Sequence, residues 1–196
     1  RLAYSSNERN GTDTDVWLLD LDSGKRRAVV TEGGAWAPTG FSPDGKQLLV
    51  ERGVSINEVH PGVVRLADDR LRMLPVDGGA AAFGSMHFGK DAKSAYYNSD
   101  EGTEFLVLRD HDFASNTLTK LSGDIPWEAE SFALSPDRSR LAYVTNEDGI
   151  SVLRVLDTET AIAKAVGIGD ALVDVEQCGV GAIADRVHRH LQPGGI

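Results

Sequence analysis

Two glycine-rich segments have the residue types of nucleotide-binding loops. The first, Gly40–Lys46, has the glycine and lysine spacing of a phosphate-binding loop. However, Gln47 follows the lysine where Ser or Thr would bind the metal, and Pro43 has no N–H to donate to phosphate. The second, Gly179–Ala184, matches the dinucleotide-binding pattern, but too few residues follow it for the second strand and the acidic ribose partner. We interpret both segments as turns, the first before a strand and the second before a helix.

Covalent hydrolysis by a serine would require a nucleophile elbow of the G-x-S-x-G type. The sequence contains no such motif. The nearest segment is Gly53–Asn57, which has Ser55 at its centre but lacks the second glycine and follows a predicted strand. We therefore expect no catalytic residue in this sequence.

The five histidines do not have the spacing of a metal site. His188 and His190 would point about 200° apart on a helix and could not bind one metal together. His60, His87 and His111 lie in different parts of the sequence, without Cys or carboxylate ligands at metal-site spacing. We interpret all five as ordinary surface, loop or strand residues.

Two acidic pairs, Asp13 with Asp15 and Asp20 with Asp22, suggest calcium loops but lack the further oxygens and the terminal glutamate. We interpret them as turn residues and expect neither a metal nor a cofactor. The large aromatic side chains are expected to fill the packing between sheets rather than to line a ligand site. They are Trp17, Trp36, Trp127, Tyr96 and Tyr97.

An internal repeat is the main signal of the sequence. The segment Phe41–Val50 contains Ser-Pro-Asp-Gly before an apolar run, and Phe88–Tyr97 and Leu134–Tyr143 match it at steps of 47 and 46 residues. One further step back reaches Arg1–Tyr4, which has the same four residues as the strand that begins at Arg140. The repeat turns are Ser42, Pro43, Asp44 and Gly45 in one copy, and Ser135, Pro136 and Asp137 in another. Four copies are thus expected, the first without its initial strand.

Each copy divides into four short strand candidates separated by turn residues, which is typical of a β-propeller blade. The sequence predicts an all-β fold of about three and a half to four four-stranded antiparallel blades. We expect a partial propeller over residues 1–166, with blades at 1–34, 35–79, 80–124 and 125–166. A tail at 167–196 is expected to contain a strand near 171–177 and a short amphipathic helix at 180–191.

The segments between the turns resemble the N-terminal propeller of the prolyl oligopeptidase family of serine peptidases. The matching stretches are Ala3–Asn7, Asp15–Trp17, Gly34–Pro38, Ser99–Phe105, Ser131–Asp137 and Thr145–Gly149. The resemblance implies a non-catalytic segment that gates peptide access to a hydrolase domain, whose residues would all lie outside this sequence. The Ser-Pro-Asp-Gly repeat is also similar to propellers of the Tol-Pal system, which leaves a protein-binding scaffold as the alternative. A self-contained ring of four blades is a third alternative.

Composition limits the partners. With 30 acidic and 20 basic residues the formal charge is -10, so nucleic acid and anionic membrane surfaces are not expected to bind. The apolar runs are too short to cross a bilayer. The single cysteine, Cys178, is compatible with the cytoplasm but does not exclude a secreted protein. Because an open array exposes blade edges, we expect the isolated chain to self-associate or to be poorly stable.

Overall fold

A computed structural model describes residues 1–76 and 78–166. Its fifteen strands form four separate antiparallel sheets, and the described residues contain no helix. The predicted all-β, blade-like fold class is therefore confirmed. The strand near 171–177 and the helix at 180–191, together with Gly179–Ala184, Cys178, His188 and His190, lie outside the described residues.

The sheets follow one another along the chain, and each is numbered here as a blade. Blade 1 has the order β1-β2-β3, formed by Leu2–Ser6, Asp15–Leu19 and Arg26–Val30. Blade 2 has the order β4-β5-β6-β7, formed by Ala35–Phe41, Gln47–Ser55, Glu58–Arg65 and Arg70–Met73. Blade 3 has the order β8-β9-β10-β11, formed by Phe83–Phe88, Ser94–Ser99, Val107–Asp112 and Thr117–Lys120. Blade 4 has the order β12-β13-β14-β15, formed by Ala129–Leu134, Arg140–Glu147, Ile150–Asp157 and Ala163–Ala165.

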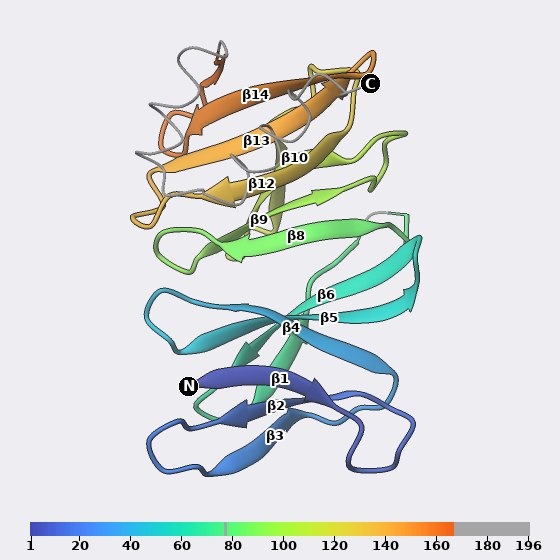
Figure 1. Ribbon diagram of the computed structural model, residues 1–196, viewed down its shortest axis with the longest axis vertical. Coiled ribbons are helices and arrows are strands. Elements are labelled where there is room, and N and C mark those ends of the chain that lie inside the picture. Colours follow the sequence, from blue (N-terminus) through green and yellow to red (C-terminus); the bar gives the residue numbers. More distant parts are fainter. Residues whose placement is uncertain (77, 167–196) are drawn as a thin grey trace, which may run out of the picture.

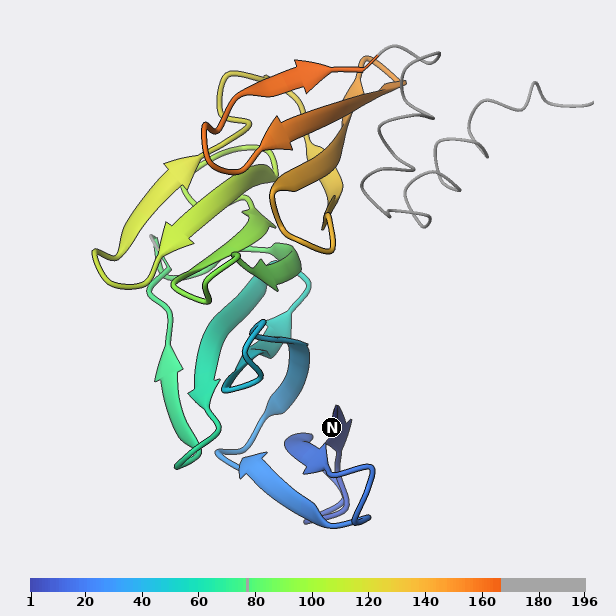
Figure 2. The ribbon, with the colours of Figure 1, turned by 90° about the vertical axis from the view of Figure 1, so that its left-hand side faces the viewer.

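The four blades are stacked face to face in chain order (Figure 1). The first strands of blades 2, 3 and 4 contact one another in succession, β4 with β8 and β8 with β12, and β1 contacts β4. Seen from the side, the stack bends into an arc with blades 1 and 4 at opposite ends (Figure 2). The described residues thus form an open array and not a closed ring of four blades.

The hydrophobic core consists of layers between adjacent blades. Alternate side chains of a strand point to opposite faces of its sheet. In β5, accordingly, Leu48 and Val50 pack in the layer toward blade 1, whereas Leu49 packs toward blade 3. In β9, Tyr97 packs toward blade 2 and Tyr96 toward blade 4. Each interior blade is therefore covered by a neighbour on both faces, which a single sheet could not achieve alone.

The predicted repeat positions occupy equivalent environments. Leu48, Ala95 and Leu141 each begin the apolar run of the second strand of a blade, and each is 0% exposed. Their cross-strand partners are Phe41, Phe88 and Leu134, the last residues of the preceding strands. The 46- to 47-residue spacing in the sequence thus corresponds to one blade.

Candidate functional site

The repeat turn of blade 2 is closed by its own side chains. Ser42 Oγ donates a hydrogen bond to Asp44 Oδ1 at 2.7 Å, and the backbone N–H of Lys46 donates to the same oxygen at 3.0 Å. The backbone N–H of Gln47 donates to Ser42 Oγ at 2.9 Å. Gly45 has φ +66°, the left-handed conformation that glycine adopts at low cost. Gly40–Lys46 is therefore the end of β4 and a tight turn, without a helix after it.

Blade 4 repeats this turn with one substitution. Ser135 Oγ donates to Asp137 Oδ1 at 2.6 Å, and the N–H of Arg140 donates to Ser135 Oγ at 3.0 Å. Pro136 stands in the same place as Pro43. Arg138 replaces the glycine and takes φ +59°. Its guanidinium Nη1 donates to the carbonyl oxygen of Phe88, so this turn also connects blade 4 to blade 3.

The turn of blade 3 keeps the aspartate and loses the serine. Asp91 Oδ1 accepts from the N–H of Lys93 at 3.1 Å, and Ala92 has φ +58°. Gly89 replaces the serine, and a Cβ there would lie 2.6 Å from Ser94 Oγ. The three turns share one backbone conformation, and only the Asp is common to all of them. Hydrogen bonds within these turns lower the pKa of Asp44 and the pKa of Asp91.

The hydrogen bonds of the blade 4 turn lower the pKa of Asp137 from its usual 3.8 to about 2, chiefly through the hydroxyl of Ser135. Because the folded-state pKa is depressed, this stabilisation is fully present above about pH 4 and is lost as the pH falls toward 2. We expect Asp137→Asn to make the loss of stability between pH 4 and pH 2 shallower, measured by urea unfolding at each pH. A carboxyl titration by NMR with a midpoint near 4 for Asp137 would contradict this.

The left-handed residue of the same turn gives a second test. At φ +59° an L-residue is strained and glycine is not. Arg138→Gly and Arg138→Ala both lose the bond to Phe88 O, so they differ only in the backbone. We expect the glycine variant to be more stable than the alanine variant by about 1 kcal/mol in urea unfolding. The same pair of substitutions at Ile150, in strand β14, is the control and should show the opposite order.

A cavity of about 380 Å³ opens on blade 2 and is lined by residues from its four strands and from the connections to blades 1 and 3. Trp36 is 2% exposed and donates from its indole Nε1 to Gly33 O at 2.9 Å. Arg52 in β5 is the cross-strand partner of Trp36, and His60 in β6 is the cross-strand partner of Arg52. The cavity lining consists of Glu32, Trp36, Arg52, His60, Met73, Leu74, Val76 and Gly79. This cavity combines a cation, an imidazole and apolar side chains.

The imidazole in this cavity does not form part of a catalytic triad within the described residues. His60 Nε2 lies 2.9 Å from Glu58 Oε1. Ser55 Oγ, at the end of β5, accepts from the backbone N–H of Asn57 at 3.2 Å, in the loop that joins β5 to β6. Gly53–Asn57 is thus the end of β5 and the start of a hairpin, so the strand extends further than the sequence analysis predicts.

Three of the four aspartates in the acidic pairs, Asp13, Asp15 and Asp20, bind other protein groups. Asp15 binds Arg9 at 2.7 Å, and Asp13 accepts from the backbone N–H of Gly34 at 2.9 Å. Asp20 accepts from the N–H and the hydroxyl of Ser23 at 2.8 and 2.6 Å. Within residues 1–76 and 78–166, no group of three His, Cys, Asp or Glu side chains is placed to hold a metal ion. In the same part of the chain, no helix has the length and apolarity to cross a membrane.

The remaining candidate residues lie in the sheets. His87 is in β8 and stacks edge-on against Phe132 of blade 4, and burial lowers its pKa. His111 in β10 is fully buried between Tyr97 Oη and Asn116 Oδ1. The structure therefore places His60, His87 and His111 in three separate strands. Of the aromatics, Trp36, Tyr96 and Tyr97 are buried, Trp17 is half-buried, and Trp127 is 36% exposed.

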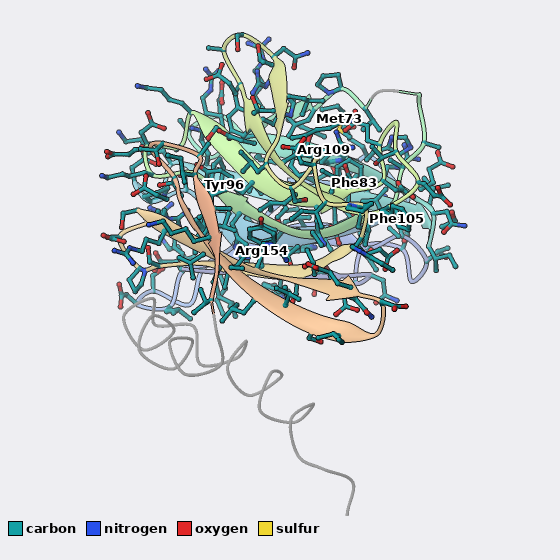
Figure 3. The ribbon with its side chains drawn as sticks, turned by 90° about the horizontal axis from the view of Figure 1, so that it is seen from above. Met73, Phe83, Tyr96, Phe105, Arg109 and Arg154 are labelled. Carbon is teal, nitrogen blue, oxygen red and sulfur yellow. The ribbon has the colours of Figure 1, made fainter. Side chains whose placement is uncertain are left out.

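Two arginines that we did not single out in the sequence hold equivalent positions in blades 3 and 4 (Figure 3). Arg109 is the cross-strand partner of Tyr97, and Arg154 is that of Tyr143. Arg109 Nη2 donates to the carbonyl oxygen of Glu101, and Arg154 forms an ion pair with Glu147 at 2.5 Å. Arg109 thus binds the segment that joins β9 to β10, whereas Arg154 binds the last residue of β13. The only sequence signal is an Arg 12 or 11 residues after the repeated Tyr.

Comparison with known proteins shows similarity at the level of structure. No protein-family model matches the chain, and the curated proteins contain no match. TolB from Acinetobacter baumannii is 23% identical, with a TM-score of 0.63 over 84% of this chain and 40% of that one. A puromycin-hydrolyzing peptidase from Mycobacterium tuberculosis is 19% identical, with a TM-score of 0.62 over 80% of this chain and 26% of that one. A prolyl endopeptidase is 18% identical, with a TM-score of 0.67 over 85% of this chain and 26% of that one.

The extent of these matches defines what they show. The chain spans 40% or less of the length of each of these three proteins. At identities below 25%, the similarity concerns the fold, and it includes both peptidase propellers and TolB. The described residues thus form a β-propeller-like array of the kind found in these proteins.

Proposed function

We propose that this chain is a non-catalytic propeller segment of a prolyl oligopeptidase-like serine peptidase and that it gates peptide access to a hydrolase domain. The observation that carries the proposal is the arc itself. The first strands of successive blades lie side by side, so β4, β8 and β12 form a continuous wall. The described residues bring together no nucleophile and base. Similarity to two peptidase structures supports this assignment.

Gating by such a wall is steric, and it requires the blades to stay together. Polar contacts join blades 3 and 4 beyond the apolar layer, and two of them are hydrogen bonds from side chains to backbone carbonyl oxygens. Asn98 Nδ2 donates to Ala129 O at 2.9 Å, and Arg138 donates to Phe88 O. A short or unstructured peptide would pass an opening that a folded protein cannot enter. The chemistry of peptide-bond hydrolysis would come from the hydrolase domain.

A protein-binding scaffold of the TolB type is the second candidate. It is favoured by the 23% identity to TolB, which exceeds the identities to the two peptidases reported above. In such a scaffold the blade loops would bind a protein partner, and no hydrolase domain would be needed. The two candidates differ in whether the natural protein contains an activated serine.

The test uses the natural protein that contains this segment. We expect a fluorophosphonate probe to label it, and we expect a short peptide to be hydrolysed while the same sequence within a folded protein is not. Asn98→Ala loosens the contact between blades 3 and 4, so it should raise cleavage of the longer substrates relative to the short one. Asn57→Ala, in an exposed loop, is the matched control. If the probe does not label the natural protein, the peptidase proposal is wrong and the scaffold is favoured.

The proposed partners follow from this function. They are the hydrolase domain and its peptide substrates. Self-association through open blade edges stays a prediction, as does the lack of binding to nucleic acid and membranes expected from the net charge of -10.

A further inference from the structure

Blade 2 departs from the repeat at the place where blades 3 and 4 have an arginine. In those two blades Arg109 or Arg154 lies opposite the tyrosine of the second strand. The equivalent cross-strand pair of blade 2 is Val50 with Gly62. Blade 2 therefore has no side chain in the place of these two arginines.

The glutamate that accompanies each arginine is also absent from blade 2. Glu101 and Glu147 both stand six positions after the first apolar residue of the repeat. The carbonyl oxygen of Glu101 accepts from Arg109, and the carboxylate of Glu147 pairs with Arg154. In blade 2 this position is Val54. An internal pair of Arg and Glu thus occupies blades 3 and 4 but not blade 2.

The cavity opens on this same face of blade 2. Arg52 and His60, which line it, stand two residues away from Val50 and Gly62 along β5 and β6, and alternate residues of a strand share a face. Met73, which also lines the cavity, lies opposite Gly62. The cavity is therefore associated with the departure of blade 2 from the repeat.

The cavity has a cation of its own. The Arg52 side chain is exposed, and no other described residue forms an ion pair or hydrogen bond with its guanidinium. A Cβ on Gly34 would lie 2.9 Å from Arg52 Nε, so the glycine leaves space for this side chain. Gly34 itself is held by Asp13, whose Oδ1 accepts from its N–H at 2.9 Å. The guanidinium is thus placed beside a fixed backbone and is available to an anion.

The other lining residues limit the kind of anion. The apolar part of the lining includes Trp36, Met73 and Leu74. Glu32 also lines the cavity, and its negative charge disfavours a ligand with a second negative charge. The volume of about 380 Å³ is near the lower end of the range for small-molecule sites. These features fit a small monoanion that is largely apolar.

We propose that the cavity of blade 2 binds a ligand with a single carboxylate on a small apolar group. The carboxylate binds the guanidinium of Arg52, which can donate two parallel hydrogen bonds to it, and the apolar group packs on Trp36 and Met73. The C-terminal residue of a peptide and a free acid of the same size share this chemistry. The inference does not depend on whether the natural protein is a peptidase or a scaffold.

The test uses the 196-residue chain and N-acetyl-L-leucine as the probe, followed by NMR of the ¹⁵N-labelled chain. We expect saturable shifts of the amide signals of Arg52 and His60 and of the indole N–H of Trp36. N-acetyl-L-leucinamide lacks the charge and acetate lacks the apolar group, so each should bind at least about tenfold more weakly. An acetylated triglycyl-leucine peptide distinguishes the two sources. Equal binding of this peptide indicates a peptide C-terminus, and weaker binding indicates a free acid.

Variants of the chain test the assigned residues. Arg52→Gln should weaken binding of N-acetyl-L-leucine at least about tenfold, because it removes the charge that holds the carboxylate. Met73→Asp should have a similar effect by placing a negative charge in the cavity. Arg70→Gln makes the same change of charge at an exposed residue of β7 that does not line the cavity, and it should bind normally. Far-UV circular dichroism verifies that each variant is folded.

Four results would overturn the proposal. They are the absence of saturable binding, equal affinity for the acid and its amide, shifts confined to residues away from blade 2, and equal binding by the Arg52→Gln and Arg70→Gln variants.

Discussion

Replacing Trp36 by alanine is expected to lower the free energy of unfolding by about 3–5 kcal/mol, the usual range for removing a large aromatic side chain from a core. Trp36 is 2% exposed and packs in the layer between blades 1 and 2 with Val16 and Leu48. The substitution also removes the hydrogen bond from its indole to Gly33 O. Since this layer joins two blades, the loss should appear as destabilisation of both. Urea unfolding followed by far-UV circular dichroism measures it.

Trp127 provides the matched control. It is 36% exposed, so its replacement by alanine removes a tryptophan without opening a cavity in a blade layer. We expect Trp127→Ala to cost less than about 1 kcal/mol. Equal effects of the two substitutions would contradict the placement of Trp36 between blades.

The second large effect concerns the repeat position itself. Leu48→Ala and Leu141→Ala should each lower the free energy of unfolding by about 2–5 kcal/mol, because both side chains are fully buried between blades. Leu2→Ala changes the same repeat position in blade 1, where the side chain is 49% exposed. We expect it to cost less than about 1 kcal/mol in the same urea experiment.

This comparison separates the effect of a residue's place in the repeat from the effect of its burial by neighbouring blades. Leu2, Leu48 and Leu141 have the same residue type and the same place in a second strand. They differ in whether a preceding blade and an inner strand cover them. Similar losses of unfolding free energy at all three positions would mean that blade 1 is covered as fully as the others. A loss below about 1 kcal/mol for Leu48→Ala would contradict the burial of Leu48 between blades 1 and 2.

Much of this fold could be predicted because the repeat fixes both the turns and the apolar runs that follow them. The turns carry side chains whose roles are local. Ser42 and Asp44 close a loop only a few residues long, so their bonds depend little on the rest of the chain. The strand-like segments at 27–30, 71–74 and 118–121 also indicate the fourth strand of a blade, and β3, β7 and β11 overlap them.

The third strands of blades 2 and 3 were harder to predict. β6 contains Pro61, which normally argues against an interior strand, but its carbonyl oxygen still accepts from the N–H of Leu74. In blade 3 the apolar residues at 105–108 indicate a strand there, whereas β10 runs from Val107 to Asp112. Four consecutive residues of β10 after Leu108 are polar, among them Arg109 and the fully buried His111.

Two of these polar strand residues, Arg109 and His111, bind groups outside their own strand. Arg109 binds the carbonyl oxygen of Glu101, and His111 lies between Tyr97 and Asn116. Such partners come from other parts of the blade, so a local pattern of apolar residues does not reveal them. The contact of Asn98 with Ala129 O cannot be predicted from a local pattern for the same reason. It joins two blades, and the two residues are 31 positions apart in the sequence.

Amide hydrogen exchange of the whole chain tests the central claim most directly, namely that successive blades shield one another. We expect slow exchange to recur at β5, β9 and β13, at steps of about 47 and 46 residues, and to be weaker at the one-sided strand β1. Uniformly fast exchange, or equal protection of β1 and its three counterparts in the free chain, would contradict the open array of blades.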